Sequence, residues 1–190
     1  ALYSKKYLLQ PHVGHDWLTR APETILAVKQ LVEMPDSTFM WQEIGTGYRV
    51  VPLGAWYGGI RQRWLLVFSE EAGKRELETY ERNLAKEKET LEKKLWHLGN
   101  DKFACQADAE KQLQKVMAKH PRFIASFSVT EKPRHAGKGR PKRGAEPIGI
   151  NVFIKAEIKE DLVVTNRQRA TKGRFVLASN RLDPKELTDE

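Results

Sequence analysis

The segment with the clearest capacity for chemistry is a cationic stretch between two runs of strand-forming residues. Between Lys132 and Gly144 it carries six basic side chains and no acidic one, in a protein of 190 residues with a formal net charge of +8. Positive charge concentrated on a loop attracts polyphosphate, because neutralising phosphates releases the counterions condensed on a nucleic acid. We therefore predict DNA contact through Lys132, Arg134, Lys138, Arg140, Lys142 and Arg143.

The centre of this stretch has a further feature. Gly139-Arg140-Pro141 is similar to a short hook that lays an arginine into the narrow minor groove of A·T-rich DNA. Glycine and proline keep the backbone there extended and slim enough to enter the groove. The alternative interpretation is a solvated hairpin tip, since charged loops are common on protein surfaces.

Aromatic residues near two arginines form a second candidate for nucleic-acid contact. Aromatic rings beside arginine can stack on unpaired bases. Core packing explains Trp64 more simply, because it begins the apolar run 64–68, whereas Trp56 and Tyr57 lie beside two glycines and leave both interpretations open. The residues concerned are Trp41, Trp56, Tyr57, Trp64, Arg61 and Arg63.

Catalytic and metal-binding patterns are not evident elsewhere in the sequence. His12 and His15 have no partners at a spacing that completes a metal shell, and Cys105 has no evident activating partner. The single cysteine excludes an internal disulfide and fits a reducing, cytoplasmic location. No apolar run approaches the ~20 residues of a membrane span. We therefore predict no catalytic residue, no metal ligand, no cofactor and no membrane partner for this chain.

The positioning elements indicate an α+β fold of mainly antiparallel strands with an inserted long helical hairpin. Leucines recur every seven residues at 77, 84, 91 and 98 in a Glu/Lys-rich stretch, which is typical of a coiled-coil helix over 70–98. Further helices are expected at 1–10, 22–32 and 104–119. Strands are expected at 17–21, 39–44, 48–57, 60–69, 123–130, 150–158, 161–165 and 174–179, with 132–147 as a loop.

Three groups of segments resemble the DDE transposases of bacterial insertion sequences, in the group with a β-rich insertion in an RNase H-like core. They are residues 1–4 with 17–25, residues 62–69 running into the charged helix, and residues 139–142 with 173–180. The resemblance implies a division into the end of the core at 1–33, the insertion at 34–69 and 121–182, the helical hairpin at 70–120, and the start of the next core helix at 183–190.

The resemblance implies a function in cut-and-paste DNA transposition. In such enzymes three carboxylates hold two Mg²⁺ ions for phosphoryl transfer. The matching positions place all three acids outside this chain, so we expect a fragment that binds and positions transposon-end DNA without cutting it. Helix-start patterns at Asp183 and at 188–190 agree with an interior fragment. The full-length enzyme is expected to need Mg²⁺ and to act as a homodimer.

One stretch imitates the catalytic glutamate helix of that family. Tyr80, Glu87 and Lys94 match three of its positions, but Asn83 stands where the family has arginine. Because the leucine pattern makes Tyr80 a packing residue, we favour a structural role for Glu87. The competing hypothesis for the whole chain is a non-enzymatic nucleic-acid-binding or protein-docking module that folds as one stable unit.

Overall fold

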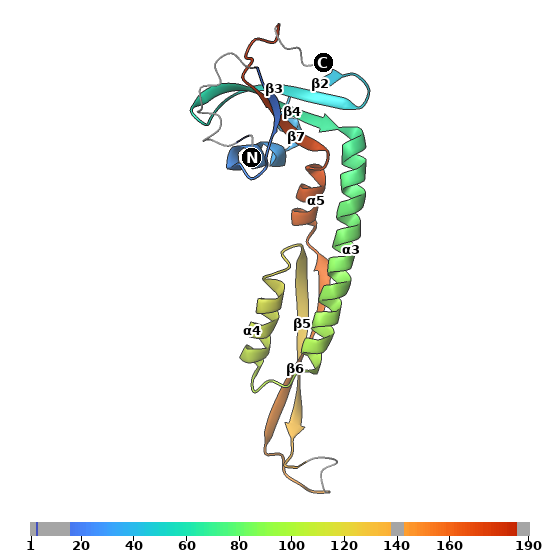
Figure 1. The fold of residues 1–190 in the computed structure, drawn as a ribbon. Coiled ribbons are helices and arrows are strands. Elements are labelled where there is room, and N and C mark those ends of the chain that lie inside the picture. The colour runs from blue at the N-terminus through green and yellow to red at the C-terminus, as the bar shows by residue number, and fades with distance from the viewer. Residues whose placement is uncertain (1–2, 4–15, 138–142, 186–190) are drawn as a thin grey trace. The chain divides into compact units, whose positions relative to one another are not determined.

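Figure 1 shows the computed structural model of the protein, which describes Tyr3 and residues 16–137 and 143–185. Two antiparallel sheets are combined with helices, and the long helix α3 (Glu70–Asn100) is followed by α4 (Gln106–Met117). The predicted α+β fold of mainly antiparallel strands with a long inserted helix is confirmed, and α4, the second helix of the predicted helical hairpin, contacts β5 (Phe123–Arg134) and β6 (Gly149–Glu160). The helix expected at 1–10 lies outside the described residues, apart from Tyr3.

The chain forms two compact units. The first unit comprises Ala1–Tyr80 and Arg167–Glu190, and the second unit comprises Glu81–Asn166. The predicted division into transposase core and insertion follows a family resemblance, whereas these two units are defined by contacts within the structure. The predicted division therefore stays a prediction.

The first unit is built on a five-stranded antiparallel sheet. Its strands, in spatial order, are β1 (Leu18–Ala21), β7 (Arg174–Ser179), β4 (Ile60–Ser69), β3 (Tyr48–Tyr57) and β2 (Gln42–Ile44). Strands β3 and β4 meet at Gly58-Gly59, whose φ angles of 65° and 85° suit the tight hairpin turn between Tyr57 and Ile60. The sequence predicted the bounds of β3, β4 and β7 correctly.

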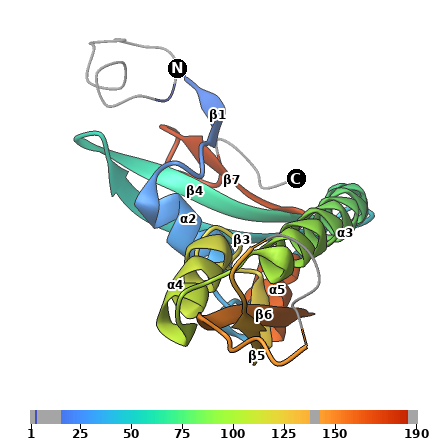
Figure 2. The same ribbon diagram turned by 90° about the horizontal axis from the view of Figure 1, so that it is seen from below.

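Both faces of this sheet carry apolar side chains. Helix α2 (Leu26–Glu33) lies beside one face of the sheet (Figure 2). It contributes Val28 and Val32 to the cluster on that face, where Leu66 and Val176 are fully buried. A smaller cluster of Val50, Leu65 and Val67 lies on the opposite face, because neighbouring residues of a strand point to opposite sides. Burial on both faces explains why residues 62–67 of β4 are all buried.

The second unit combines a two-stranded ribbon with helices. Strands β5 (Phe123–Arg134) and β6 (Gly149–Glu160) pair antiparallel along their whole length. Val152 and Ile154 of β6 are buried, as are Ala109 and Leu113 of α4. On α3 the buried leucines are Leu84, Leu91, Leu95 and Leu98, whereas Leu77, in the first unit, is 38% exposed. These positions confirm the predicted apolar seam except at its first member.

Two local predictions gave the wrong kind of structure, and two further elements start later than predicted, since α2 begins at Leu26 instead of 22 and β2 at Gln42 instead of 39. Residues 161–165 were expected to form a strand, but α5 (Leu162–Ala170) begins there. The carboxylate of Asp161 accepts hydrogen bonds from the backbone N–H groups of Val163 (3.0 Å) and Val164 (3.2 Å), which caps the helix and overrides the strand preference of the two valines. Strand β5 also extends to Arg134, so the first basic residues of the predicted loop belong to the ribbon.

Among the described residues, no helix is both long and apolar enough to cross a membrane.

Candidate nucleic-acid interface

The ribbon places two of the predicted DNA-binding residues on one face. Lys132 lies opposite Asn151 and Arg134 lies opposite Gly149, in the last pairs before the connecting segment. Since they are two residues apart in a strand, their side chains share a face. Both residues are exposed. The ammonium of Lys132 lies 5.1 Å from the ring centroid of Phe153, and the guanidinium of Arg134 lies over Gly149, where a Cβ would be 3.3 Å from Nη2.

The connecting segment carries the rest of the predicted set. Arg143 is exposed in a turn at its far side. Lys138, Arg140 and Lys142 lie outside the described residues. The structure therefore brings Lys132 and Arg134 together on the ribbon and leaves the hook hypothesis for Arg140 as a prediction.

The strand register reveals two further cations that the sequence analysis missed. Lys155 lies opposite Ser128 and Lys159 lies opposite Ile124, on the same ribbon face as Lys132 and Arg134. The buried residues Phe123, Val152 and Ile154 point to the other face. We call the four residues Lys132, Arg134, Lys155 and Lys159 the cationic face. The sequence of β6 alone shows a strand of mixed charge. Predicting the cationic face would have required both the alternation of side chains along each strand and the correct register between β5 and β6.

The cationic face runs along the whole ribbon. Lys132, Lys155 and Lys159 follow one another along the ribbon at intervals of four residue pairs. Each interval corresponds to about 13 Å along the strand direction. Glu157 is the acidic residue on this face, and its carboxylate lies 3.6 Å from the ammonium of Lys155. Both side chains of that pair are strongly exposed, so the pairing is weak and leaves the face positively charged.

The aromatic candidates divide between the core and the surface. Trp64 is buried, and its indole N–H donates to Gln62 Oε1 at 2.9 Å, which confirms the core interpretation. Tyr57 stacks on Tyr3 with ring centroids 5.4 Å apart. Burial raises the pKa of the Tyr3 phenol to about 12, although the hydrogen bond from Trp64 opposes that rise. Trp56 is 74% exposed and lies directly opposite Arg61 in the hairpin.

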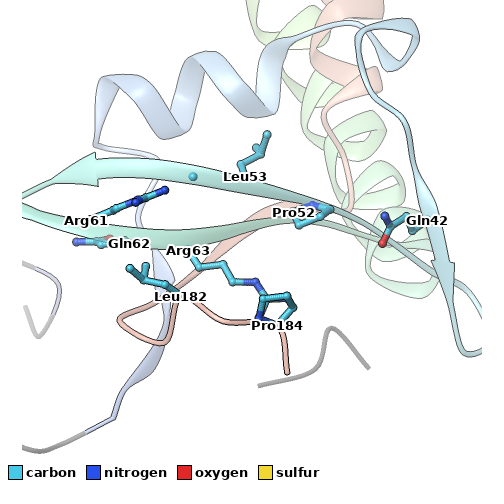
Figure 3. Close-up of a pocket in the computed structure, with 9 residues that line it drawn as sticks. Gln42, Pro52, Leu53, Arg61, Gln62, Arg63, Leu182 and Pro184 are labelled. Carbon is cyan, nitrogen blue, oxygen red and sulfur yellow. The ribbon is translucent and has the colours of Figure 1, made fainter. Parts of the chain in front are cut away.

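A pocket opens beside that hairpin (Figure 3). Its volume is about 470 Å³, and its lining includes Pro52, Gly54, Arg61, Arg63, Leu182 and Pro184. Arg61 and Arg63 share one strand face, but Arg63 is buried and already engaged in a further interaction. Trp56 and Arg61 are therefore the members of the aromatic set that remain placed for a ligand on the surface.

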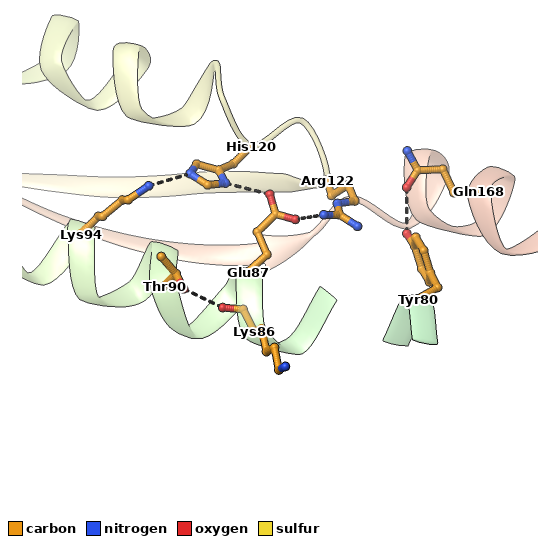
Figure 4. Close-up of polar contacts among 8 residues, drawn as sticks. All are labelled: Tyr80, Lys86, Glu87, Thr90, Lys94, His120, Arg122 and Gln168. Carbon is orange, nitrogen blue, oxygen red and sulfur yellow. Dashed lines mark hydrogen bonds and ion pairs between the residues drawn. The ribbon is translucent and has the colours of Figure 1, made fainter. Parts of the chain in front are cut away.

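The glutamate that imitates the transposase pattern is held in an ion-pair cluster (Figure 4). Oε1 of Glu87 accepts a hydrogen bond from Nδ1 of His120 at 2.7 Å, and Oε2 pairs with Arg122. Lys94 lies 3.4 Å from Nε2 of the same histidine, not at the carboxylate. Tyr80 is buried, and its hydroxyl donates to Gln168 at 2.9 Å. Both side chains are thus engaged in packing and pairing, as favoured from the sequence.

The surroundings of Glu87 differ from those of a magnesium site. The described part of the chain contains no group of three His, Cys, Asp or Glu side chains that could hold a metal ion. Glu87 faces His120 and Arg122 instead of further carboxylates, so the residues present do not fit Mg²⁺. Cys105 is exposed directly before α4, while His12 and His15 lie outside the described residues.

Comparisons with known proteins find no family model, no curated sequence and no solved structure that matches this chain. The resemblance to DDE transposases therefore stays a prediction from the sequence segments that carry it.

Proposed function

We propose that this chain binds DNA through the cationic face and the basic end of the β5–β6 ribbon, as the DNA-positioning part of a cut-and-paste DDE transposase. The basic end consists of Lys132, Arg134, Lys138, Arg140, Lys142 and Arg143. The observation that carries the proposal is the alignment of Lys132 and Arg134 with Lys155 and Lys159 on one exposed ribbon face.

The charge distribution favours a polyanion as the ligand. The cationic face has four basic residues and one acidic residue, and it leads into a segment with further basic residues and no acid before Glu146. Lysine and arginine contacts to phosphates supply the sequence-independent part of DNA affinity. The opposite ribbon face carries the buried residues Phe123, Val152 and Ile154, so the core of the unit lies on that side and the charged face remains open to a ligand.

The transposase context adds the expected chemistry of the whole enzyme. The three segments that resemble that family imply a Mg²⁺-dependent enzyme that acts in the cytoplasm on transposon ends as a homodimer. Its catalytic carboxylates would come from outside these 190 residues. In this proposal the ribbon positions the DNA, and the chain alone does not cut it.

Salt-dependent DNA binding tests the interface. We expect Lys132→Ala, Arg134→Ala and Arg143→Ala together to weaken binding of a 30-base-pair duplex and to lower the slope of log affinity against log salt by about 3, since each phosphate contact contributes about 0.9. Fluorescence anisotropy across a sodium chloride series measures both quantities. Lys155→Ala with Lys159→Ala should lower the slope by about 2.

A matched control removes the same number of positive charges from residues outside the ribbon. Lys86, Lys111 and Lys115 are exposed on α3 and α4 of the same unit. Their replacement by alanine should leave the salt slope nearly unchanged. Equal losses in the two triple variants would mean that net charge alone attracts DNA, and the proposed interface would be wrong.

The hook hypothesis and the transposase context have separate tests. Arg140→Ala should remove a preference for A·T-rich over G·C-rich duplex, because the minor groove distinguishes these pairs. For the context, sequencing the flanking gene should reveal an aspartate codon just upstream and a glutamate-bearing helix downstream. Their absence would favour a non-enzymatic binding module with the same DNA interface.

A further inference from the structure

The first unit contains a second concentration of positive charge, in a pocket of about 320 Å³ near the start of α3. Its lining carries five basic side chains and two acidic ones, which leaves an excess of three positive charges. The basic residues are Arg49, Lys74, Arg169, Lys172 and Arg174, and the acidic residues are Asp36 and Glu70. None of these residues belongs to the ribbon.

Two glycines bring the basic residues together. Gly173 has φ +82°, and a Cβ there would lie 2.6 Å from the carbonyl oxygen of Ser69 and 2.8 Å from Cα of Gly73. Its N–H donates to Glu76 at 3.0 Å. Only a residue without a side chain allows this contact, so the turn that carries Lys172 and Arg174 lies directly on the first turns of α3.

The acids in the lining do not match the cations in number. Asp36 is paired with Arg174, and its other carboxylate oxygen lies 3.9 Å from Arg49. Glu70 is paired with Lys74 at 2.8 Å, and this hydrogen bond lowers the pKa of Glu70, so both members of the pair stay charged at neutral pH. One carboxylate therefore serves two guanidinium groups.

Aromatic rings lie against three of the cations, Arg49, Arg169 and Lys172, without neutralising them. The guanidinium of Arg49 lies 4.4 Å from the ring centroid of Phe68 and 5.0 Å from that of Trp41. The ammonium of Lys172 lies 5.1 Å from the ring centroid of Tyr80. A ring face orients a cation and leaves its N–H groups available to an anion.

Arg174 adds a buried donor at the pocket wall. Its side chain is 4% exposed, and Nη1 donates to the carbonyl oxygens of Val32 (3.0 Å) and Met34 (2.7 Å). Its Nε has no hydrogen-bond partner among the described residues. A buried donor without an acceptor is unfavourable, and a bound oxyanion would offset this cost through its charge near the guanidinium, since the Nε atom itself is enclosed.

We propose that this pocket binds a phosphate group. Arginine and lysine form strong charge-assisted hydrogen bonds to phosphate oxygens, and here they come from three separate parts of the chain, around Arg49, Lys74 and Lys172. The site is independent of the ribbon, so its failure would leave the proposed DNA interface untouched.

Titration of the folded chain with sodium phosphate, followed by amide chemical shifts, tests the proposal. We expect saturable shifts at Lys74, Lys172, Gly173 and Arg174 that sodium chloride of equal ionic strength does not produce. Lys172→Gln should weaken phosphate binding about five- to tenfold, as expected for the loss of one charge-assisted contact. Lys172→Arg should restore it.

The controls separate a lost ligand contact from a lost fold. Lys29→Gln removes an exposed charge from α2 in the same unit and should leave binding unchanged. Thermal melts of all variants should coincide with that of the unchanged chain. Shifts that do not saturate, or equal affinity in Lys172→Gln, would overturn the proposal. A parallel titration with the dinucleotide TpT distinguishes a backbone phosphodiester from free phosphate as the source of the group.

Discussion

The two long β-hairpins of this protein have the same pairing but different surroundings. In the first unit, β3 and β4 also pair with β2 and β7, and most of β4 is buried. Among the strands that the structure describes, β5 and β6 of the second unit pair only with each other. Within the described residues, the one further bridge to this ribbon joins Phe103 to Val152 of β6. A hairpin with neighbouring strands on both sides is buried and serves as a scaffold, whereas a ribbon with one exposed face can present charged side chains to a ligand.

The segments that connect the two strands of each hairpin also differ, in length and in charge. Gly58-Gly59 closes β3–β4 in two residues, with both glycines at positive φ. The β5–β6 ribbon ends in a long basic segment. A tight glycine turn limits what the end of a hairpin can reach, while a longer segment adds side chains for a ligand.

The largest effect expected from this comparison is on core packing. Leu66→Ala in β4 should lower the free energy of unfolding by about 2–5 kcal/mol, because it leaves a cavity at a fully buried site. Ile124→Ala in β5 should cost less than about 1 kcal/mol, since that side chain is 57% exposed on the cationic face. Urea unfolding followed by circular dichroism measures both. Similar losses would break the comparison.

A smaller effect is expected at the polar cluster of the second unit. Glu87→Gln removes the carboxylate that pairs with His120 and Arg122, both little exposed, and should cost about 1–3 kcal/mol. Glu89→Gln is the matched control on the same helix, where an exposed pair with Lys93 should contribute nothing measurable. The same urea experiment applies.

Glu87→Gln also tests the rejected catalytic role. If the proposed transposase context holds and Glu87 is structural, the variant placed in the full-length protein should keep strand cleavage wherever it still folds. Cleavage abolished with folding and DNA binding intact would show that Glu87 is the catalytic glutamate.

The smallest effect concerns pH and the first unit. The folded pKa of Tyr3, about 12, lies above its ordinary value near 10, so its neutral form stabilises the fold below pH 10 and this contribution is lost as pH rises toward 12. Between pH 9 and 11 the loss should be about 1 kcal/mol. Tyr3→Phe should lack this extra decline, as measured by urea unfolding at each pH. The same decline in both proteins would assign it to other groups.

Local patterns predicted much of this fold. The bounds of β3 and β4 follow from strand-forming runs on either side of Gly58-Gly59, and the leucine repeat predicted the buried side of α3. The error at residues 161–165 shows the limit of such patterns. Val163 and Val164 favour a strand, but the side-chain cap from Asp161 satisfies their backbone N–H groups in a helix.

The candidate site was only half visible in the sequence. Lys132 and Arg134 could be selected because six basic residues stand close together in the chain. Lys155 and Lys159 could not, because the pairing of β5 with β6 decides which of their neighbours share a face. The pocket around Arg174 was out of reach, since its partner Asp36 is 138 residues away.

The sequence by itself determined where charge is concentrated, where strands turn and which side of the long helix is apolar, because each depends on residues within a few positions of one another. The tertiary structure decided which charges act together. The strand register aligned the cationic face, and the contact between Gly73 and Gly173 assembled the phosphate pocket. Both depend on close approach of distant backbone segments, which no local pattern encodes.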